Sequence, residues 1–195
     1  MIAFISLGSN RPYWRQGEGL SPVSIVRLAA GYIDQLPHTQ LWASSGLYES
    51  AAIGPGRQRP YINAVAAVDT QLHAHELLAA LNTTEDMLGR TRSRPWQART
   101  LDLDLLDYNA TVTPTQWRLD GQGKAPQTLA LSAPASAKQR TLMLPHPRLH
   151  MRDFVLRPLA ELCPNWVHPV YDVTVAKLLK RVPSSPLRRL GPLTL

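Results

Sequence analysis

The sequence predicts an α+β fold with one main domain. Short apolar runs typical of buried strands alternate with two segments in which apolar residues recur at helical spacing. The length of 195 residues fits one domain with additions, large enough to bury a core without disulfides or metals. The composition, 44% hydrophobic and 18% charged, is that of a globular protein. We expect a folded domain over residues 1–172 and a basic tail over residues 173–195.

The first half of the chain supplies one strand, one helix and two further strands. Residues 2–7 form an apolar run that ends in glycine, which predicts a buried strand. Ser21 and Pro22 suit the N-cap and first position of a helix, and apolar residues then recur at helical spacing. Residues 41–48 and 61–69 are predicted strands, separated by a loop rich in glycine and proline.

The second half adds one helix and one strand. Residues 75–88 place leucines along one face of a helix, and Gly89 suits its C-terminal stop. Residues 101–108 alternate between acidic and apolar side chains, which predicts a strand. The resulting order, β-α-β-β-α-β, is that of a ferredoxin-like sandwich.

Two regions are expected to be irregular. Residues 109–140 contain three prolines and only weak periodicity, so we expect a long insertion here. Residues 153–162 then predict a helix that Pro158 kinks or restarts. Residues 173–195 again contain three prolines and have mixed polarity, which predicts an irregular, loosely held C-terminal tail.

Charge and cysteine content narrow the partners and compartments. The 21 basic and 14 acidic side chains give a net charge of +7, which favours an anionic partner such as nucleic acid, a membrane surface or nucleotide phosphates. A single cysteine, Cys163, excludes an internal disulfide and a cysteine-based zinc site. No apolar run approaches the roughly 20 residues that cross a bilayer. The first residues lack the basic segment of a signal peptide, so we expect a cytoplasmic protein.

The predicted strand at 101–108 carries the strongest candidate for a metal site. Asp102 and Asp104 are two residues apart, so in a strand their side chains share one face while the leucines share the other. Neighbouring carboxylates repel unless a cation lies between them, and Mg²⁺ is usually held by one or two carboxylates plus substrate phosphates. A half-exposed strand that simply alternates acid and leucine fits the pattern equally well.

Clustered arginines precede these acids. Between residues 90 and 99 the chain has no acid and carries Arg90, Arg92, Arg94 and Arg99. A guanidinium binds two phosphate oxygens at once. Acids beside clustered arginines are typical of a site for a metal–polyphosphate complex, which is the site that phosphoryl transfer requires. A basic surface loop paired with nearby acids is the alternative.

Two polar residues are further candidates. His146 lies between two prolines, where a histidine is more often structural than a donor to phosphate. Asn63 lies in an otherwise apolar predicted strand, and a buried amide needs hydrogen-bond partners. Such an amide is either satisfied within the protein or reads the polar edge of a heterocycle.

Taken together, these segments resemble the 6-hydroxymethyl-7,8-dihydropterin pyrophosphokinase family of folate biosynthesis. The matching pieces are LGSN at 7–10, YINAV at 61–65, Glu85 with Gly89 and Arg90, RTLDLD at 99–104, LPHP at 144–147, and Arg152 with FVLRPLAE at 154–161. The combination of RTLDLD, LPHPR and FVLRPLAE is highly specific. The resemblance extends from residue 2 to about residue 169, interrupted by the insertion.

The resemblance implies a reaction and a set of site residues. The family moves the β,γ-diphosphate of ATP to the hydroxymethyl oxygen of the pterin and releases AMP, using two Mg²⁺ ions on a ferredoxin-like scaffold. It implies that Asp102 and Asp104 bind the metals and that Arg90 and Arg99 are catalytic. The implied nucleotide contacts are Arg92, Trp96, His146 and Arg152. The implied pterin contacts are Ser50, Ala51, Ile53, Tyr61, Asn63 and Phe154.

Two other functions stay open. A catalytically degraded relative would bind nucleotide or a partner without turnover, whereas a basic ferredoxin-like module would bind RNA. The retained acids and arginines argue against the first, and the absence of an RNA-binding motif argues against the second. We expect ATP and the pterin as small-molecule partners of a monomer that binds neither nucleic acid nor membrane.

Overall fold

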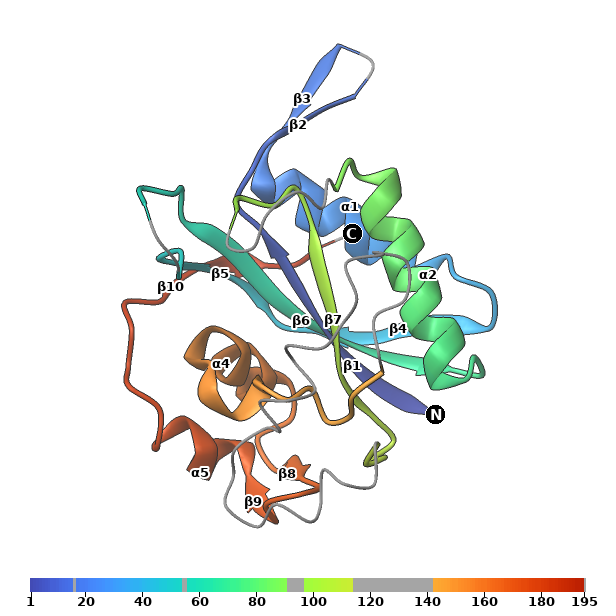
Figure 1. Ribbon diagram of the computed structural model, residues 1–195, viewed down its shortest axis with the longest axis vertical. Coiled ribbons are helices and arrows are strands. Elements are labelled where there is room, and N and C mark those ends of the chain that lie inside the picture. The colour runs from blue at the N-terminus through green and yellow to red at the C-terminus, as the bar shows by residue number, and fades with distance from the viewer. Residues whose placement is uncertain (16, 54–55, 91–96, 114–141, 195) are drawn as a thin grey trace.

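The computed structural model describes residues 1–15, 17–53, 56–90, 97–113 and 142–194. Within these ranges the chain forms a six-stranded antiparallel sheet, two short two-stranded sheets and four α-helices (Figure 1). The predicted mixed α+β architecture is therefore confirmed. The strands of the main sheet are β1 (Ile2–Ser9), β4 (Thr39–Ser44), β5 (Gly46–Ser50), β6 (Tyr61–Thr70), β7 (Asp102–Tyr108) and β10 (Arg188–Pro192).

The order of strands in this sheet is β10-β5-β6-β1-β7, and β4 also pairs with β6. The sequence predicts one strand over residues 41–48, but the structure divides it at Ser45. The buried Ser45 hydroxyl accepts a hydrogen bond from the backbone N–H of Val65 on β6 (2.9 Å). Because a side chain replaces a backbone carbonyl at this point, the ladder is interrupted and β4 and β5 pair with different parts of β6.

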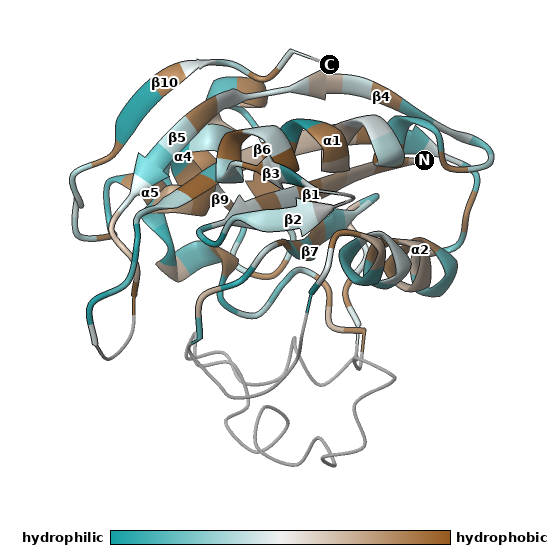
Figure 2. Cartoon of the chain, turned by 90° about the horizontal axis from the view of Figure 1, so that it is seen from above, coloured by the Kyte–Doolittle hydropathy of each residue, from teal (hydrophilic) through white to brown (hydrophobic). Residues whose placement is uncertain are grey.

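Helices cover both faces of the sheet (Figures 1 and 2). One face packs against α1 (Pro22–Asp34) and α2 (Ala74–Met87), and the other against α4 (Asp153–Leu162) and α5 (Val175–Leu179). Alternation along β1 makes the division plain, since Ile5 packs in the first core and Phe4 in the second. The sheet therefore separates two apolar cores.

The local helix signals are confirmed. Ser21 is the N-cap of α1, and its hydroxyl accepts a hydrogen bond from the backbone N–H of Ser24 (3.1 Å). Gly89 follows α2 with φ of +74°, and an added Cβ would collide with the ring of Tyr13. A residue with a side chain would therefore be both strained and obstructed at this position.

The C-terminal segment is not the irregular tail that the sequence predicts. It forms α5 and then β10, which pairs antiparallel with β5 as an edge strand. Leu193 is buried in the core beside α1 and α2. Prolines that indicate a loop in the sequence are compatible with this edge position, because an edge strand leaves half of its backbone groups unpaired.

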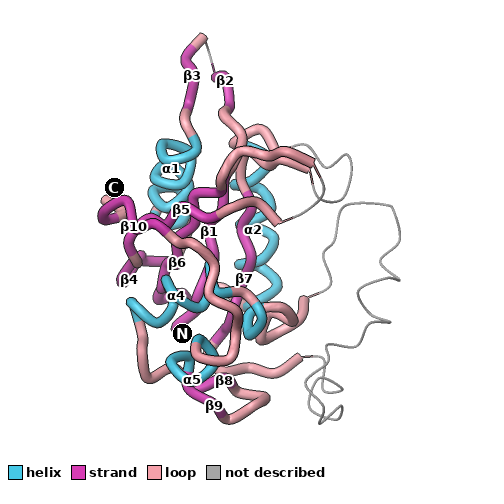
Figure 3. Tube along the Cα trace, turned by 90° about the vertical axis from the view of Figure 1, so that its left-hand side faces the viewer, coloured by secondary structure: helices cyan, strands magenta, loops and turns pink. Residues whose placement is uncertain are grey.

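The remaining elements are short. A hairpin of β2 (Tyr13–Arg15) and β3 (Glu18–Leu20) projects beyond the body of the protein (Figures 1 and 3). A second hairpin, β8 (Val167–His168) and β9 (Val173–Thr174), lies beside α5, and the 3₁₀ turn η2 (Leu149–Met151) precedes α4. None of the helices in the described part of the chain is long and apolar enough to span a membrane.

Two predictions on irregular segments have different outcomes. The predicted helix at 153–162 is confirmed as α4, which continues through Pro158 without restarting. Most of the predicted insertion at 109–140 lies outside the described residues. Its flanks meet at an isolated antiparallel bridge in which Thr113 and Leu144 exchange two backbone hydrogen bonds of 2.8 Å each.

Candidate functional site

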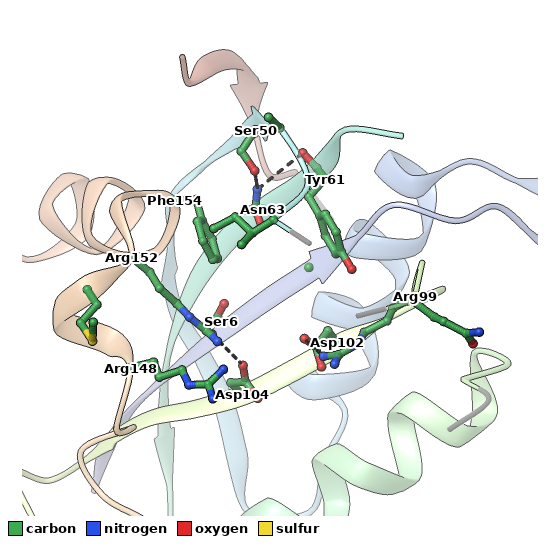
Figure 4. A pocket seen from close by; sticks show the side chains of 15 residues that line it. Ser6, Ser50, Tyr61, Asn63, Arg99, Asp102, Asp104, Arg148, Arg152 and Phe154 are labelled. Carbon is green, nitrogen blue, oxygen red and sulfur yellow. Dashed lines mark hydrogen bonds and ion pairs between the residues drawn. The ribbon is translucent and has the colours of Figure 1, made fainter. Parts of the chain in front are cut away.

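A pocket of about 470 Å³ lies on the α4 face of the sheet (Figure 4). Its floor comes from alternate residues of β1, β6 and β7, and its walls come from the loop after β5 and from the chain that leads into α4. The lining residues are Ser6, Gly8, Ser50, Ala51, Ile53, Tyr61, Asn63, Gln97, Arg99, Asp102, Asp104, Arg148, Met151, Arg152 and Phe154. This set joins five segments of the chain.

At one end of the pocket, a buried amide faces an aromatic wall. The Asn63 side chain donates hydrogen bonds to the Ser50 hydroxyl (2.9 Å) and the Tyr48 carbonyl (3.4 Å). Its Oδ1 accepts no hydrogen bond within the described part of the chain, so this acceptor is available to a ligand. Phe154, in the first turn of α4, and Tyr61 line the same end (Figure 4). The arrangement suits a flat heterocycle with polar edges.

At the other end, two carboxylates share the floor. Asp102 and Asp104 lie on the α4 face of β7, with side chains 18% and 21% exposed, while Leu103 packs in the opposite core. The predicted shared face of the two acids is therefore confirmed. Asp104 lies 3.7 Å from the Arg152 guanidinium and 3.8 Å from the His146 ring nitrogen Nε2. Both distances exceed those of ordinary hydrogen bonds, so Arg152 and His146 act on Asp104 mainly through their charge and dipole.

The two predicted catalytic arginines occupy different places. Arg99 lines the pocket and forms an ion pair with Asp102. Burial favours the neutral form of Arg99, but the carboxylate of Asp102 outweighs that effect and raises the pKa of the guanidinium. Arg90 is only 6% exposed, is absent from the pocket lining, and binds both Glu85 and Asp102, the latter at 2.7 Å. Arg90 therefore supports the floor from below.

His146 and Arg152 flank Asp104 on the side of the 3₁₀ turn. The backbone N–H of Arg148 donates to His146 Nδ1 (3.2 Å), which places the neutral ring's proton on Nε2, toward Asp104. Burial lowers the pKa of His146 and outweighs the opposing effect of Asp104. Burial also lowers the pKa of Arg152, whose guanidinium lies 5.7 Å from the centre of the Phe154 ring. One arginine thus touches both ends of the pocket.

The structure brings most of the predicted residues together. Ten line the pocket: Ser50, Ala51, Ile53, Tyr61, Asn63, Arg99, Asp102, Asp104, Arg152 and Phe154. Ile53 is at the rim, 62% exposed. Arg90 and His146 lie beneath or beside the pocket, and Arg92 and Trp96 lie outside the described residues.

Five lining residues were not identified from the sequence: Ser6, Gly8, Gln97, Arg148 and Met151. Ser6 and Gly8 carry a usable signal, because they alternate with the core residues Ile5 and Leu7 and so face the same side as Asn63. Arg148 follows the histidine between prolines and adds a third arginine to the pocket. Gln97 and Met151 have no comparable signal.

The donor set can be tested against Mg²⁺. Among the described residues, no group of three or more histidine, cysteine, aspartate or glutamate side chains could enclose a metal ion. The described residues therefore do not provide the four protein ligands that a structural zinc takes. Two carboxylates facing an open pocket do fit Mg²⁺, which keeps water and takes substrate phosphates as its other ligands.

Comparison with known proteins adds independent information. A family model described as 7,8-dihydro-6-hydroxymethylpterin-pyrophosphokinase (HPPK) matches residues 4–164. A 2-amino-4-hydroxy-6-hydroxymethyldihydropteridine pyrophosphokinase from Haemophilus influenzae is 32% identical over 192 residues, covering 98% of this chain and 99% of that protein. A protein of the same name from Pseudomonas aeruginosa is 34% identical over 162 residues, covering 83% of this chain and 80% of that protein.

Solved structures give the same result for the fold. The wild-type HPPK-DHPS of Plasmodium falciparum superposes with a TM-score of 0.59 over 92% of this chain, at 13% sequence identity. This chain spans 44% of that longer one. At this level of identity the likeness concerns the architecture alone.

Proposed function

Because this chain belongs to the HPPK family, we propose that it transfers diphosphate from ATP to the hydroxymethyl group of 6-hydroxymethyl-7,8-dihydropterin, releasing AMP, in folate biosynthesis. The observation that carries the proposal is the division of one pocket into two ends. Asn63 and Phe154 lie at an end suited to a flat heterocycle, whereas Asp102, Asp104 and Arg99 lie at an end suited to a metal–phosphate group.

In the proposed reaction, the pterin hydroxyl oxygen forms a bond to the β-phosphorus of ATP. The bond between that phosphorus and the α,β-bridging oxygen breaks, AMP leaves with the electron pair, and the hydroxyl proton passes to solvent. Two Mg²⁺ ions, bound to Asp102 and Asp104 and to phosphate oxygens, would supply charge neutralisation and alignment of the triphosphate.

The protein's own side chains hold the two substrates in place. Asn63 and the backbone near Ser50 and Ala51 bind the polar edge of the pterin, and Tyr61 and Phe154 cover its faces. Tyr61 stays neutral at physiological pH, since burial raises the pKa of its phenol. Ile53 closes the rim.

Four basic groups act on the phosphates and the acids that hold the metal. Arg99, at the mouth of the phosphate end, neutralises charge on the transferred group, whereas the buried Arg90 acts by holding Asp102. Arg152 and His146 flank Asp104 and contact the nucleotide. Arg92 and Trp96 are proposed as further nucleotide contacts on the basis of the resemblance alone.

The order β1, α1, β4–β5, β6, α2, β7 supports a ferredoxin-like core. We further propose that this core and α4 form a pyrophosphokinase domain over residues 1–172, to which α5 and β10 are joined in the same sheet and cores. It would act as a monomer in the cytoplasm without nucleic-acid or membrane partners.

The direct test is AMP formation from MgATP with and without 6-hydroxymethyl-7,8-dihydropterin. AMP that depends on the pterin and disappears with EDTA is the expected result. ADP in place of AMP would indicate ordinary kinase chemistry. ATP binding without any product would favour a degraded relative instead.

A further inference from the structure

We propose that Glu161, held by Arg189 of the C-terminal strand, is a positioning residue that sets the spacing between the two walls of the pterin end. The inference rests on the proposed function, because it concerns how the same pocket selects its pterin. Glu161 lies on α4, the helix that carries Phe154, and reaches across to β5, the strand that ends at Ser50.

Glu161 joins three elements through its carboxylate. One oxygen accepts hydrogen bonds from the Tyr48 hydroxyl (2.7 Å) and the Gly46 backbone N–H (3.1 Å), both on β5. The other accepts from the Arg189 guanidinium on β10 (2.8 Å). Charge-assisted hydrogen bonds from three donors fix the carboxylate in one orientation. The distance between α4 and β5 at this end of the sheet therefore depends on Glu161.

The link continues to the residue proposed to read the pterin. Tyr48 is the register partner of Asn63, and its carbonyl oxygen accepts a hydrogen bond from the Asn63 amide (3.4 Å). The same amide donates to Ser50, two residues further along β5 (2.9 Å). A shift of β5 relative to α4 would move Ser50, and with it the hydrogen-bonded Asn63 of β6, relative to Phe154. The space between these residues and Phe154 would then change.

The C-terminal segment is built to hold this arrangement. Arg189 passes so close to β5 that a Cβ on Gly46 would lie 2.8 Å from its Nε. Ser185 donates its backbone N–H to the carboxylate of Asp153 at the start of α4 (2.8 Å). The segment after α5 is therefore attached to α4 near both ends, beside Phe154 through Asp153 and beside β5 through Glu161.

The charge on Glu161 is also stabilised by its surroundings. Burial disfavours the charge on Glu161, but hydrogen bonds from Arg189, Tyr48 and Gly46 outweigh burial and lower the pKa of the carboxyl. The phosphate end has a separate support, because Asp102 is held by Arg90 and Arg99 and not by the C-terminal strand. A substitution of Arg189 is thus expected to weaken pterin binding more than ATP binding.

The test compares substitutions on β10 by steady-state kinetics of AMP formation. Arg189→Ala is expected to raise the KM for the pterin about fivefold while the KM for ATP changes less than about twofold, the scale of one partly exposed charged hydrogen bond. Arg189→Lys keeps a donor and is expected to restore most of the pterin KM. Arg188→Ala is the matched control, because Arg188 pairs with Glu49 at the edge of β5 and, among the described residues, forms no ion pair with α4.

Tyr48→Phe provides a second variant that leaves all charges in place, and it is expected to raise the pterin KM by a smaller factor. Equal rises in both KM values, an unchanged pterin KM for Arg189→Ala, or the same effect for Arg188→Ala would overturn the inference. Wild-type protein measured in parallel reports on the proposed function itself. If the wild type releases no AMP, the proposed function is wrong. If the wild type is active but the variants change both KM values equally, only the inference about Glu161 is wrong.

Discussion

The carboxylate of Glu85 accepts a hydrogen bond from the backbone N–H of Leu103 (2.7 Å), the residue between the two candidate metal ligands. Glu85 is fully buried and also binds the guanidinium of Arg90, which in turn reaches Asp102. Helix α2 therefore fixes both the strand and the cation beneath the phosphate end of the pocket. These contacts give Glu85 a structural role beneath the pocket.

Glu85→Ala is expected to destabilise the fold by about 3 kcal/mol, because it removes a buried carboxylate that binds a buried guanidinium and accepts the Leu103 N–H. Chemical denaturation measures the change. Asp86→Ala is the control, since it removes the same charge from the exposed neighbouring position on α2. Equal stabilities for the two variants would contradict the role assigned to Glu85.

Asp104→Asn is expected to lower turnover more than about 100-fold, because it removes a proposed metal ligand without changing side-chain volume. The asparagine side chain keeps the place of Asp104 beside Arg152 and His146, so little loss of stability is expected. Asp102→Asn is expected to lose both turnover and stability, since Asp102 binds Arg90 and Arg99. Rates of AMP formation and thermal unfolding distinguish the two. Near-normal activity in a folded double variant would remove the two-metal interpretation.

Asn63→Ala and Arg99→Ala are expected to have opposite kinetic signatures. Loss of the Asn63 amide removes hydrogen bonds at the pterin end, so the pterin binds more weakly while ATP binds normally. Loss of the Arg99 guanidinium removes charge at the phosphate end, so kcat falls more than the affinity for the pterin. Equilibrium binding of each substrate, combined with kcat, separates these effects. If both variants changed only thermal stability, the assignment of the two ends would be wrong.

A buried histidine outside the pocket predicts a pH-dependent stability. His168 is 0% exposed, its Nδ1 accepts the Val170 N–H (3.2 Å), and its ring packs against His150 and Tyr171. Burial, together with the nearby His150, lowers the pKa of His168 from 6.5 to about 4. Between these values the unfolded chain binds a proton that the folded protein excludes, so stability is lost as the pH falls through this range.

The size of this effect is about 3 kcal/mol, taking 1.36 kcal/mol for each unit of pKa. The measurement is chemical denaturation at pH values from 7 to 4, a range that spans both pKa values of His168. His168→Gln is expected to flatten the profile, because glutamine does not titrate. His75→Gln, at an exposed position of α2, is the control, and it is expected to keep the wild-type dependence of stability on pH. A profile identical in wild type and His168→Gln would exclude this histidine as the cause.

Local signals in the sequence predict the centre of the fold well. The N-cap at Ser21, the stop at Gly89 and the alternation around Asp102 each depend on neighbouring residues, and the corresponding elements form where expected. The C-terminal strand could not be predicted in the same way. Its partner strand is distant in sequence, and the ion pair between Arg188 and Glu49 joins residues 139 positions apart.

The candidate site shows the same limit. Strand alternation predicts that Asp102 and Asp104 share a face, and the two acids do line the pocket together. Arginine spacing does not predict that Arg99 enters the pocket while Arg90 lies below it, because the position of Arg90 depends on the buried Glu85. The contacts of Glu161 likewise could not be predicted, because one of its hydrogen-bond donors, Arg189, comes from β10.

One pocket is proposed to bind a pterin and a metal–ATP complex and to transfer diphosphate from ATP to the pterin. The most direct measurement is the appearance of AMP and diphosphorylated pterin from MgATP and 6-hydroxymethyl-7,8-dihydropterin, followed with wild-type protein, with Asp104→Asn and with EDTA. We expect AMP and pterin diphosphate in equal amounts from the wild type, a rate lower by more than about 100-fold with Asp104→Asn, and neither product with the chelator. AMP release without the pterin, or at a near-normal rate with Asp104→Asn, would contradict the proposal.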